Sequence, residues 1–161
     1  MNTKYSFNNS LHPKKIIYCV DIHGSEHNFR RLLIESTKLG VEVIIIGGDI
    51  NIDLKDVILF NHYRLLLIPG ECDDVYITKY ARELNILSDG VVVDVDGIKI
   101  GCVGGLTTHQ SIRRLYKYIN TIGGLDLLVT HFPPKGCLDS VLNNLHSGLR
   151  EVRDLILRYS V

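Results

Sequence analysis

The sequence has no excess of charge of either sign. Its 18 Lys and Arg residues equal its 18 Asp and Glu residues, so the net charge is zero with neutral histidines. Nucleic acids and anionic membranes attract proteins mainly through a positive excess. The chain also lacks an apolar run of the ~18–20 residues that a membrane-spanning helix needs. These absences argue against nucleic-acid and membrane partners.

Targeting signals and paired cysteines are also scarce. Residues 1–15 are rich in Asn, Ser and Lys and lack the apolar segment of a signal peptide, so we interpret them as a polar lead-in and expect a cytoplasmic protein. No CxxC pair occurs. Two of the four cysteines, Cys19 and Cys102, lie in apolar strand-like runs, where a thiol behaves as a small hydrophobe. Buried free thiols are therefore favoured over disulfides or a thiolate metal site.

The length and composition fit one soluble domain. The chain has 161 residues, of which 45% are hydrophobic and 22% charged. Neither an internal repeat nor a domain linker is evident, so we expect a single domain over residues 16–161.

Apolar strand-like runs alternate with amphipathic helical segments. Strands are predicted at 16–20, 41–46, 65–68, 91–95, 98–103 and 125–130. Helices are predicted at 29–39, 54–60, 75–84, 111–120 and 149–158. Gly40 ends the first helix, and Asp73 or Asp74 caps the third. The pattern predicts an α/β fold: a largely parallel sheet covered on both faces, with an antiparallel hairpin added at Asp96-Gly97.

Polar residues recur just past the buried strands. Asp21 and His23 follow the first run, Asp49 the second, Glu71 the third and His131 the last. Any one of these segments alone is typical of a turn or a helix cap. Loops at the carboxyl ends of strands converge in open α/β sheets, however, and four such loops indicate a common site. The mixed oxygen and imidazole donors suit Mn, Fe or Zn better than Ca or Mg.

Four segments carry a specific resemblance: VDIHG (20–24), IIGGDI (45–50), IPGECDD (68–74) and VTHFPPKGCLD (129–139). Together they resemble the calcineurin-like metallophosphoesterase superfamily, whose signature runs D-x-H, G-D-x-x, G-N-x-[DE], G/T-H and G-H-x-H. The last segment is similar to a small prokaryotic branch of predicted phosphoesterases. The likeness extends from about residue 16 to the C-terminus and implies a metallophosphoesterase-type α/β sandwich.

The resemblance implies a role for each matching residue. Asp21 and His23 would bind a first metal, Asp49 would bridge two metals, and Glu71 and His131 would bind the second. Two divalent ions, expected to be Mn, Fe or Zn, would clamp a phosphoryl group and generate a hydroxide for attack. The implied activity is hydrolysis of a phosphomonoester or phosphodiester, with the ligands Asp21, His23, Asp49 and His131 as the catalytic set.

The third motif departs from the family pattern. Glu71 stands where the signature has Asn. A glutamate can bind a divalent metal through oxygen, but it is one methylene longer and adds a charge that repels a phosphate. The alternative is that Glu71 points to solvent from a decayed site. Cys72 follows where many relatives carry a histidine that assists catalysis, although relatives with G-N-C-D lack it.

The last motif is absent, because no Gly-His-x-His occurs in the sequence. Each metal would then lack one histidine, so the chain could bind two metals, one or none. His109 and His146 are candidate substitutes, with a surface histidine as the alternative for both. Three other histidines belong to no recognised motif: His12, His27 and His62. Of these, His27 follows His23 closely in the sequence. The family strands that follow this motif are also missing, so we expect an open apolar edge that can pair with a second copy. A naturally short protein, a fragment of a longer one and a sheet completed by a second subunit all remain open.

Two functions remain open from the sequence. One is a metal-dependent phosphoesterase acting on a small phosphoester, impaired to the degree that its ligands are incomplete. The other is a degenerate phosphoesterase fold that serves as a binding or assembly module. A nucleic-acid module has little support, because Arg113, Arg114 and Lys117 form only a small cluster on a predicted helix.

Overall fold

Strands and helices alternate along the chain in the computed structural model, which describes residues 15–53, 62–142 and 145–161. In these residues the strands are β1 (Ile16–Cys19), β2 (Val43–Ile46), β3 (Arg64–Leu67), β4 (Val92–Val95), β5 (Ile98–Val103) and β6 (Leu127–Thr130). The helices are α1 (Glu26–Leu39), α2 (Val75–Glu83), α3 (Thr108–Ile122) and α4 (Arg150–Tyr159). The predicted α/β class is confirmed. The predicted helix at 54–60, residues 1–14 of the predicted lead-in and His12 lie outside the described residues.

The strands form two three-stranded sheets. In the first, β1 pairs in parallel with β2 and β2 in parallel with β3. In the second, β5 pairs antiparallel with β4 and in parallel with β6. The hairpin at Asp96-Gly97 is confirmed, with φ values of 51° and 91° at its two turn residues. The sequence pattern predicted one largely parallel sheet, whereas the structure divides the strands between two.

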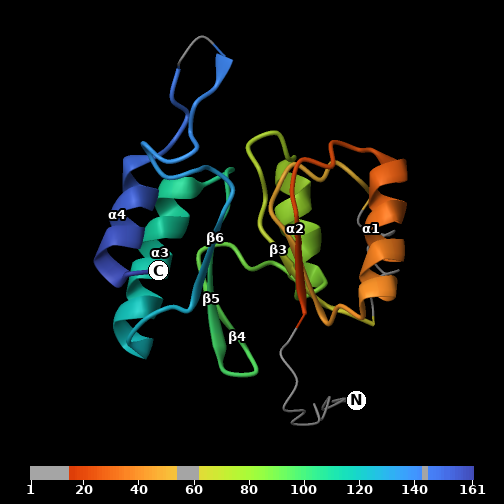
Figure 1. Cartoon of the computed structure of the whole chain (residues 1–161), viewed down its shortest axis with the longest axis horizontal. Coiled ribbons are helices and arrows are strands. Elements are labelled where there is room, and N and C mark those ends of the chain that lie inside the picture. The colour runs from red at the N-terminus through yellow and green to blue at the C-terminus, as the bar shows by residue number, and fades with distance from the viewer. Residues whose placement is uncertain (1–14, 54–61, 143–144) are drawn as a thin grey trace.

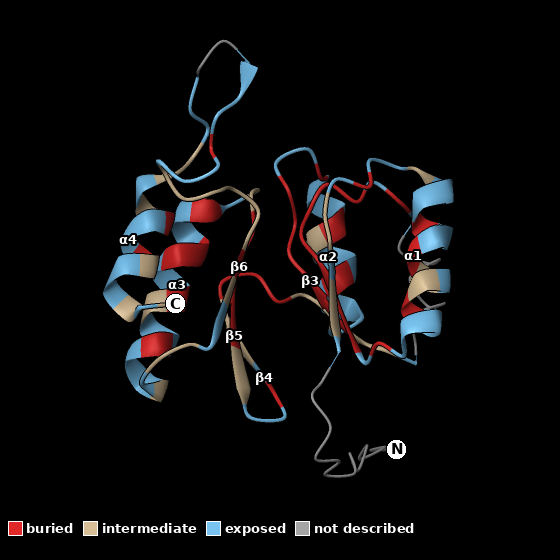
Figure 2. Ribbon diagram, in the orientation of Figure 1, coloured by how far each residue is buried: buried red, intermediate tan, exposed pale blue. Residues whose placement is uncertain are grey.

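Three apolar clusters show how the sheets and helices pack. One lies between the two sheets and joins Ile45 and Leu66 to Ile100 and Cys102. A second packs α1 and α2 against the first sheet, and a third packs α3 and α4 against the second. The order of layers is therefore helices, sheet, sheet, helices (Figure 1). Figure 2 shows that the buried residues follow the strands and the inner faces of the helices.

Local signals set the helix ends. Ser25 caps α1 by accepting a hydrogen bond from the backbone N–H of Asn28, and Gly40 ends the helix at φ 60°. Of the two candidate caps for α2, Asp74 is the one that acts, because its side chain accepts from the Tyr76 N–H at 2.9 Å. Asp73 therefore does not cap α2.

All four cysteines are free, as predicted. Cys102 is buried and Cys19 half-buried, and burial raises the pKa of each thiol to about 12. Cys72 and Cys137 are exposed, so the expectation of burial was wrong for this pair. Both lie in loops that follow strands. In the described part of the chain, none of the helices combines the length and the apolar character needed to cross a bilayer.

Replacing Ile45 by Ala should destabilise the fold strongly. Ile45 is 1% exposed and lies in the cluster between the two sheets. Truncating such a side chain leaves a cavity and should lower the free energy of unfolding by about 2–4 kcal/mol. Urea unfolding checks this, with Ile34→Ala as the control because Ile34 is 54% exposed. Equal losses in the two variants would contradict the assignment of this core.

Candidate metal centre

Loops at the strand ends bring the candidate ligands together. The strands of the first sheet run in parallel, so the segments after β1, β2 and β3 emerge at one edge. The segment after β6 reaches the same place from the second sheet, because the His131 ring contacts the Gly47 carbonyl and the Glu71 carboxylate. Residues about 110 positions apart in the sequence therefore meet at one end of the two sheets.

Asp21, His23 and Asp49 form a first group of potential metal ligands. One donor atom from each lies within 4.8 Å of the others. The His23 Nε2 atom is 3.9 Å from Asp21 Oδ1 and 3.9 Å from Asp49 Oδ2. The side chains of Asp21 and His23 are 57% and 53% exposed, so this group is open to solvent.

Asp49, Glu71 and His131 form a second group. Asp49 and Glu71 offer oxygens within 4.8 Å of each other and of the Cys72 sulfur. His131 Nε2 lies 3.9 Å from Asp49 Oδ2 and contacts Glu71 Oε2 directly. The Glu71 carboxylate therefore faces the cluster, although its side chain is 49% exposed.

Asp49 is the residue that the two groups share. Its side chain is only 4% exposed, and its Oδ2 lies 3.9 Å from both His23 Nε2 and His131 Nε2. Its other oxygen, Oδ1, accepts a hydrogen bond from the Cys72 N–H at 3.0 Å. A buried carboxylate between two imidazoles can offer an oxygen to an ion on either side.

The His131 ring is held in one orientation. Its Nδ1 lies 2.7 Å from the Gly47 carbonyl oxygen and must donate to it, so in the neutral ring Nε2 carries the lone pair. Metal-binding histidines are commonly fixed through their other nitrogen in this way. Burial by itself lowers the pKa of His131, but the Gly47 carbonyl and the carboxylates of Glu71 and Asp49 outweigh it and raise the pKa. A metal ion would displace this proton, so metal affinity should fall with falling pH.

Asp73 holds the loop that contains Asp49 through hydrogen bonds to its backbone. Its buried carboxylate accepts hydrogen bonds from the backbone N–H groups of Asp49 (2.8 Å), Ile50 (2.9 Å), Asn51 (3.3 Å) and Gly70 (2.8 Å). It thereby joins the loops after β2 and β3. The sequence offered Asp73 as an alternative cap of α2, and Asp73 also fills the [DE] position of the third motif.

The backbone at the site is unusual. Asp21, His23, Asp49 and Asn51 all have positive φ, between 45° and 58°. Non-glycine residues rarely adopt this region, and clusters of such residues typically mark functional sites. Backbone hydrogen bonds hold the loops together, including His23 N–H to the Asp49 carbonyl at 2.8 Å. Gly70 is required here, since a Cβ at this position would overlap the Asp49 carboxylate.

The two candidate substitutes for the missing histidines have other partners. His109 lies 3.4 Å from Glu151, so it joins α3 to α4. His146 lies 2.8 Å from Asp139 within the loop before α4 (Figure 1). His27 is exposed and belongs to neither described ligand group. Among the described residues, the potential ligands of the second group are therefore Asp49, Glu71, His131 and the neighbouring Cys72.

The Asp139–His146 pair predicts a pH effect. Asp139 accepts from the Gly136 N–H at 2.9 Å and pairs with His146, and these contacts hold its pKa below the usual range. When folding lowers the pKa of a carboxyl, the carboxyl stabilises the protein at pH values above its unfolded-state pKa, roughly 3.9. This stabilisation is lost as the pH falls through the folded-state pKa. Asp139→Asn should therefore be less stable than wild type near neutrality, and the difference should shrink below about pH 4.

Urea unfolding of both proteins across this pH range checks the prediction. The exposed Asp154→Asn variant on α4 is the control. A destabilisation of Asp139→Asn that does not change with pH would contradict it.

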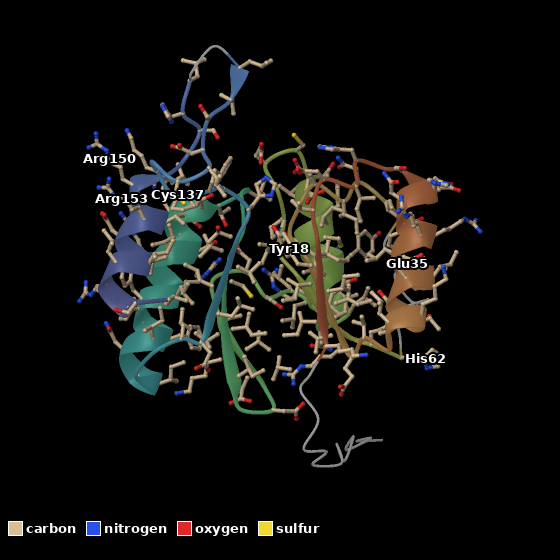
Figure 3. All side chains as sticks on the ribbon, in the orientation of Figure 1. Tyr18, Glu35, His62, Cys137, Arg150 and Arg153 are labelled. Atoms are coloured by element: carbon tan, nitrogen blue, oxygen red, sulfur yellow. The ribbon has the colours of Figure 1, made fainter. Side chains whose placement is uncertain are left out.

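The donors fit divalent metal ions: three carboxylates and two imidazoles, with one buried carboxylate common to both groups. Side chains with nitrogen and oxygen atoms gather in the loops at this end of the molecule (Figure 3). Comparisons with protein-family models, with curated proteins and with solved structures found no match. The likeness to metallophosphoesterases therefore rests on the four sequence motifs.

Proposed function

We propose that the chain is a metal-dependent phosphoesterase with a metallophosphoesterase-type sandwich. The observation that carries the proposal is the position of Asp49, buried between His23 and His131 with its Oδ2 3.9 Å from each Nε2. This arrangement supports a bridging ligand flanked by two ion positions. The resemblance of the four motifs, read independently from the sequence, assigns the same residue to the same role.

Five side chains would hold two ions of Mn, Fe or Zn. Asp21 and His23 would hold one, Glu71 and His131 the other, and Asp49 both. Bound ions of this kind supply Lewis acidity and activate a nucleophile at neutral pH. Exposure of Asp21 and His23, at 57% and 53%, leaves room for a small phosphoester to approach.

Glu71 shapes the charge of the site. Two divalent ions carry four positive charges, and Asp21, Asp49 and Glu71 carry three negative ones, so the loaded centre keeps a net positive charge. An anionic phosphoester would still be attracted, though less strongly than to a centre with Asn in place of Glu71. We therefore propose a phosphoesterase with weakened substrate binding.

The alternative function is a degenerate fold that acts as a binding or assembly module. The direct contact between Glu71 and His131 favours it, because the two groups can satisfy each other without a metal. In that case the carboxylate and the imidazole would serve as a structural ion pair.

Hydrolysis of p-nitrophenyl phosphate and of bis(p-nitrophenyl) phosphate with added Mn²⁺ separates the two functions. The phosphoesterase predicts turnover by the wild type and by Asp74→Asn, an exposed carboxylate beside the site that caps α2. Turnover should be lost in Asp49→Asn. Wild-type rates no higher than those of Asp49→Asn with either ester would refute the enzymatic function and favour the module.

A further inference from the structure

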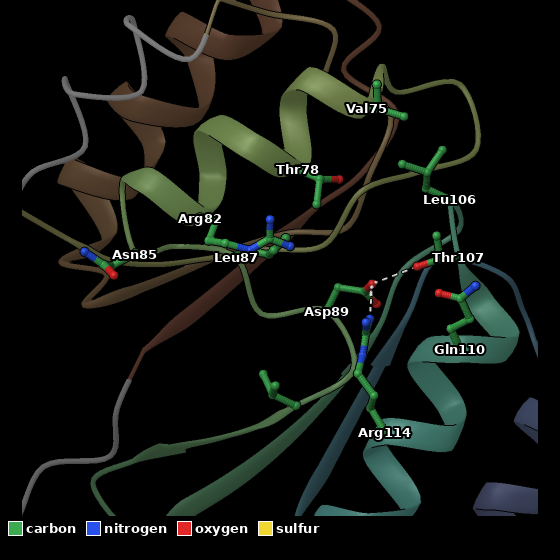
Figure 4. Close-up of a pocket in the computed structure, with 11 residues that line it drawn as sticks. Val75, Thr78, Arg82, Asn85, Leu87, Asp89, Leu106, Thr107, Gln110 and Arg114 are labelled. Atoms are coloured by element: carbon green, nitrogen blue, oxygen red, sulfur yellow. Dashed lines mark hydrogen bonds and ion pairs between the residues drawn. The ribbon is translucent and has the colours of Figure 1, made fainter.

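A groove lies between α2 and α3 (Figure 4). Its volume is about 640 Å³, within the roughly 300–1,000 Å³ typical of small-molecule sites. The described lining comes from α2, α3 and the segments that precede β4 and α3. None of the five proposed metal ligands lines it.

The floor of the groove is a satisfied polar network around Asp89. The Asp89 side chain is 5% exposed and accepts hydrogen bonds from the Gly104 N–H (2.7 Å) and the Ser111 hydroxyl (2.6 Å). Arg114 pairs with it at 3.1 Å, and Thr107 reaches it at 3.4 Å (Figure 4). Arg114 thus balances the charge of Asp89 and holds that wall in place.

The α2 wall carries polar groups that the fold does not use. Arg82 is exposed and, within the described part of the chain, has no carboxylate in ion-pair distance. The Thr78 hydroxyl oxygen is buried and lacks a hydrogen-bond partner, which a folded protein rarely leaves unexplained. Thr78 is one of the residues that line the groove (Figure 4).

We propose that this groove binds a small organic anion with an apolar body. Arg82 provides the charge for a carboxylate or phosphate, because the other ionised groups of the described lining, Asp89 and Arg114, neutralise each other. Leu87 and Leu106 provide an apolar surface on the two sides for the body of the ligand. A charged head on one wall and apolar contacts beside it are the usual composition of a small-molecule site.

Heteronuclear NMR on the full chain tests this site independently of the metal centre. Metal is first removed with a chelator, and the chelator is then dialysed away. Phenyl phosphate and benzoate are titrated separately, with inorganic phosphate and benzyl alcohol as probes for head and body alone. Saturable shifts are expected at α2 amides near Thr78 and Arg82 and at α3 amides near Gln110. The organic anion that binds more tightly shows whether the groove prefers a phosphate or a carboxylate.

Arg82→Gln should weaken that binding about tenfold or more, because a charge-assisted contact is lost. Arg153→Gln, an equally exposed cation on α4, is the matched control and should bind as wild type does. Three results would each overturn the proposal. Benzyl alcohol could bind as tightly as the anions, Arg82→Gln could bind the anions as wild type does, or no saturable shift could occur along α2 and α3. Asp49→Asn should bind the anions normally, which separates this site from the proposed function.

Discussion

Asp49→Asn is expected to lose metal binding at both ion positions. The substitution removes the only carboxylate common to the two groups and places an amide nitrogen against the lone pair of an imidazole or against an ion. Changes to groups that merely support metal ligands cost about 10–100-fold in affinity. Loss of the bridging ligand should cost at least about a hundredfold, measured by calorimetric titration with Mn²⁺.

The fold should survive this change. An amide oxygen can still accept the Cys72 N–H bond, and removal of a buried negative charge beside Glu71 relieves repulsion. Urea unfolding of the metal-free proteins should therefore give stabilities within about 1 kcal/mol of each other. Mn²⁺ binding by Asp49→Asn at wild-type affinity would show that Asp49 does not bridge two ions.

Asp73→Asn is expected to destabilise the protein and weaken metal binding together. The Asp73 carboxylate accepts four backbone N–H bonds through two oxygens, whereas Asn offers one oxygen and turns an NH₂ group toward the remaining donors. Buried donors left without a partner cost about 1–3 kcal/mol each, so a loss of roughly 3 kcal/mol in unfolding free energy is expected. Mn²⁺ affinity should fall about 10–100-fold, since Asp49 loses its support.

Asp74→Asn is the matched control for this prediction. Asp74 is adjacent in sequence but exposed, and Asn caps a helix as well as Asp does, so its stability should change by only about 0.5 kcal/mol. Unfolding by urea and Mn²⁺ titration are measured on both variants. Equal effects at positions 73 and 74 would contradict the role of Asp73 in shaping the loop.

The secondary structure was largely predictable, and the arrangement of the sheets was not. Short apolar runs such as 41–46 and 98–103 predicted strands because each is too short for a helix and ends at turn residues. The same runs could not reveal two sheets. Strands of both sheets face helices on one side and the opposite sheet on the other, so a continuous apolar pattern arises either way. Only the pairing of the strands distinguishes one sheet from two, and the sequence does not show that pairing.

The residues of the candidate metal centre were predictable, but the residues that support them were not. Asp21, His23, Asp49, Glu71 and His131 follow strands and carry metal-binding side chains, and the structure brings all five together. Asp73 fills the [DE] position of the third motif, but nothing in the sequence shows that its carboxylate accepts backbone hydrogen bonds from two loops. The positive φ values at the site also left no signal, since Asp and His at strand ends adopt several conformations.

The proposed histidine substitutes show a different limit. His109 and His146 were candidates because the sequence lacks the Gly-His-x-His motif and other histidines would have to replace its ligands. Each instead pairs with a carboxylate elsewhere, Glu151 and Asp139 respectively. Long-range packing decides which acidic partner a loop histidine meets, and no local pattern encodes it.

Anomalous diffraction from crystals loaded with Mn²⁺ tests the central claim most directly. Two peaks about 3.5–4 Å apart are expected, one on each side of the Asp49 carboxylate. The first should lie against Asp21 and His23, and the second against Glu71 and His131. Absence of a peak among these five side chains under saturating Mn²⁺, or peaks only elsewhere on the protein, would contradict the proposed metal centre.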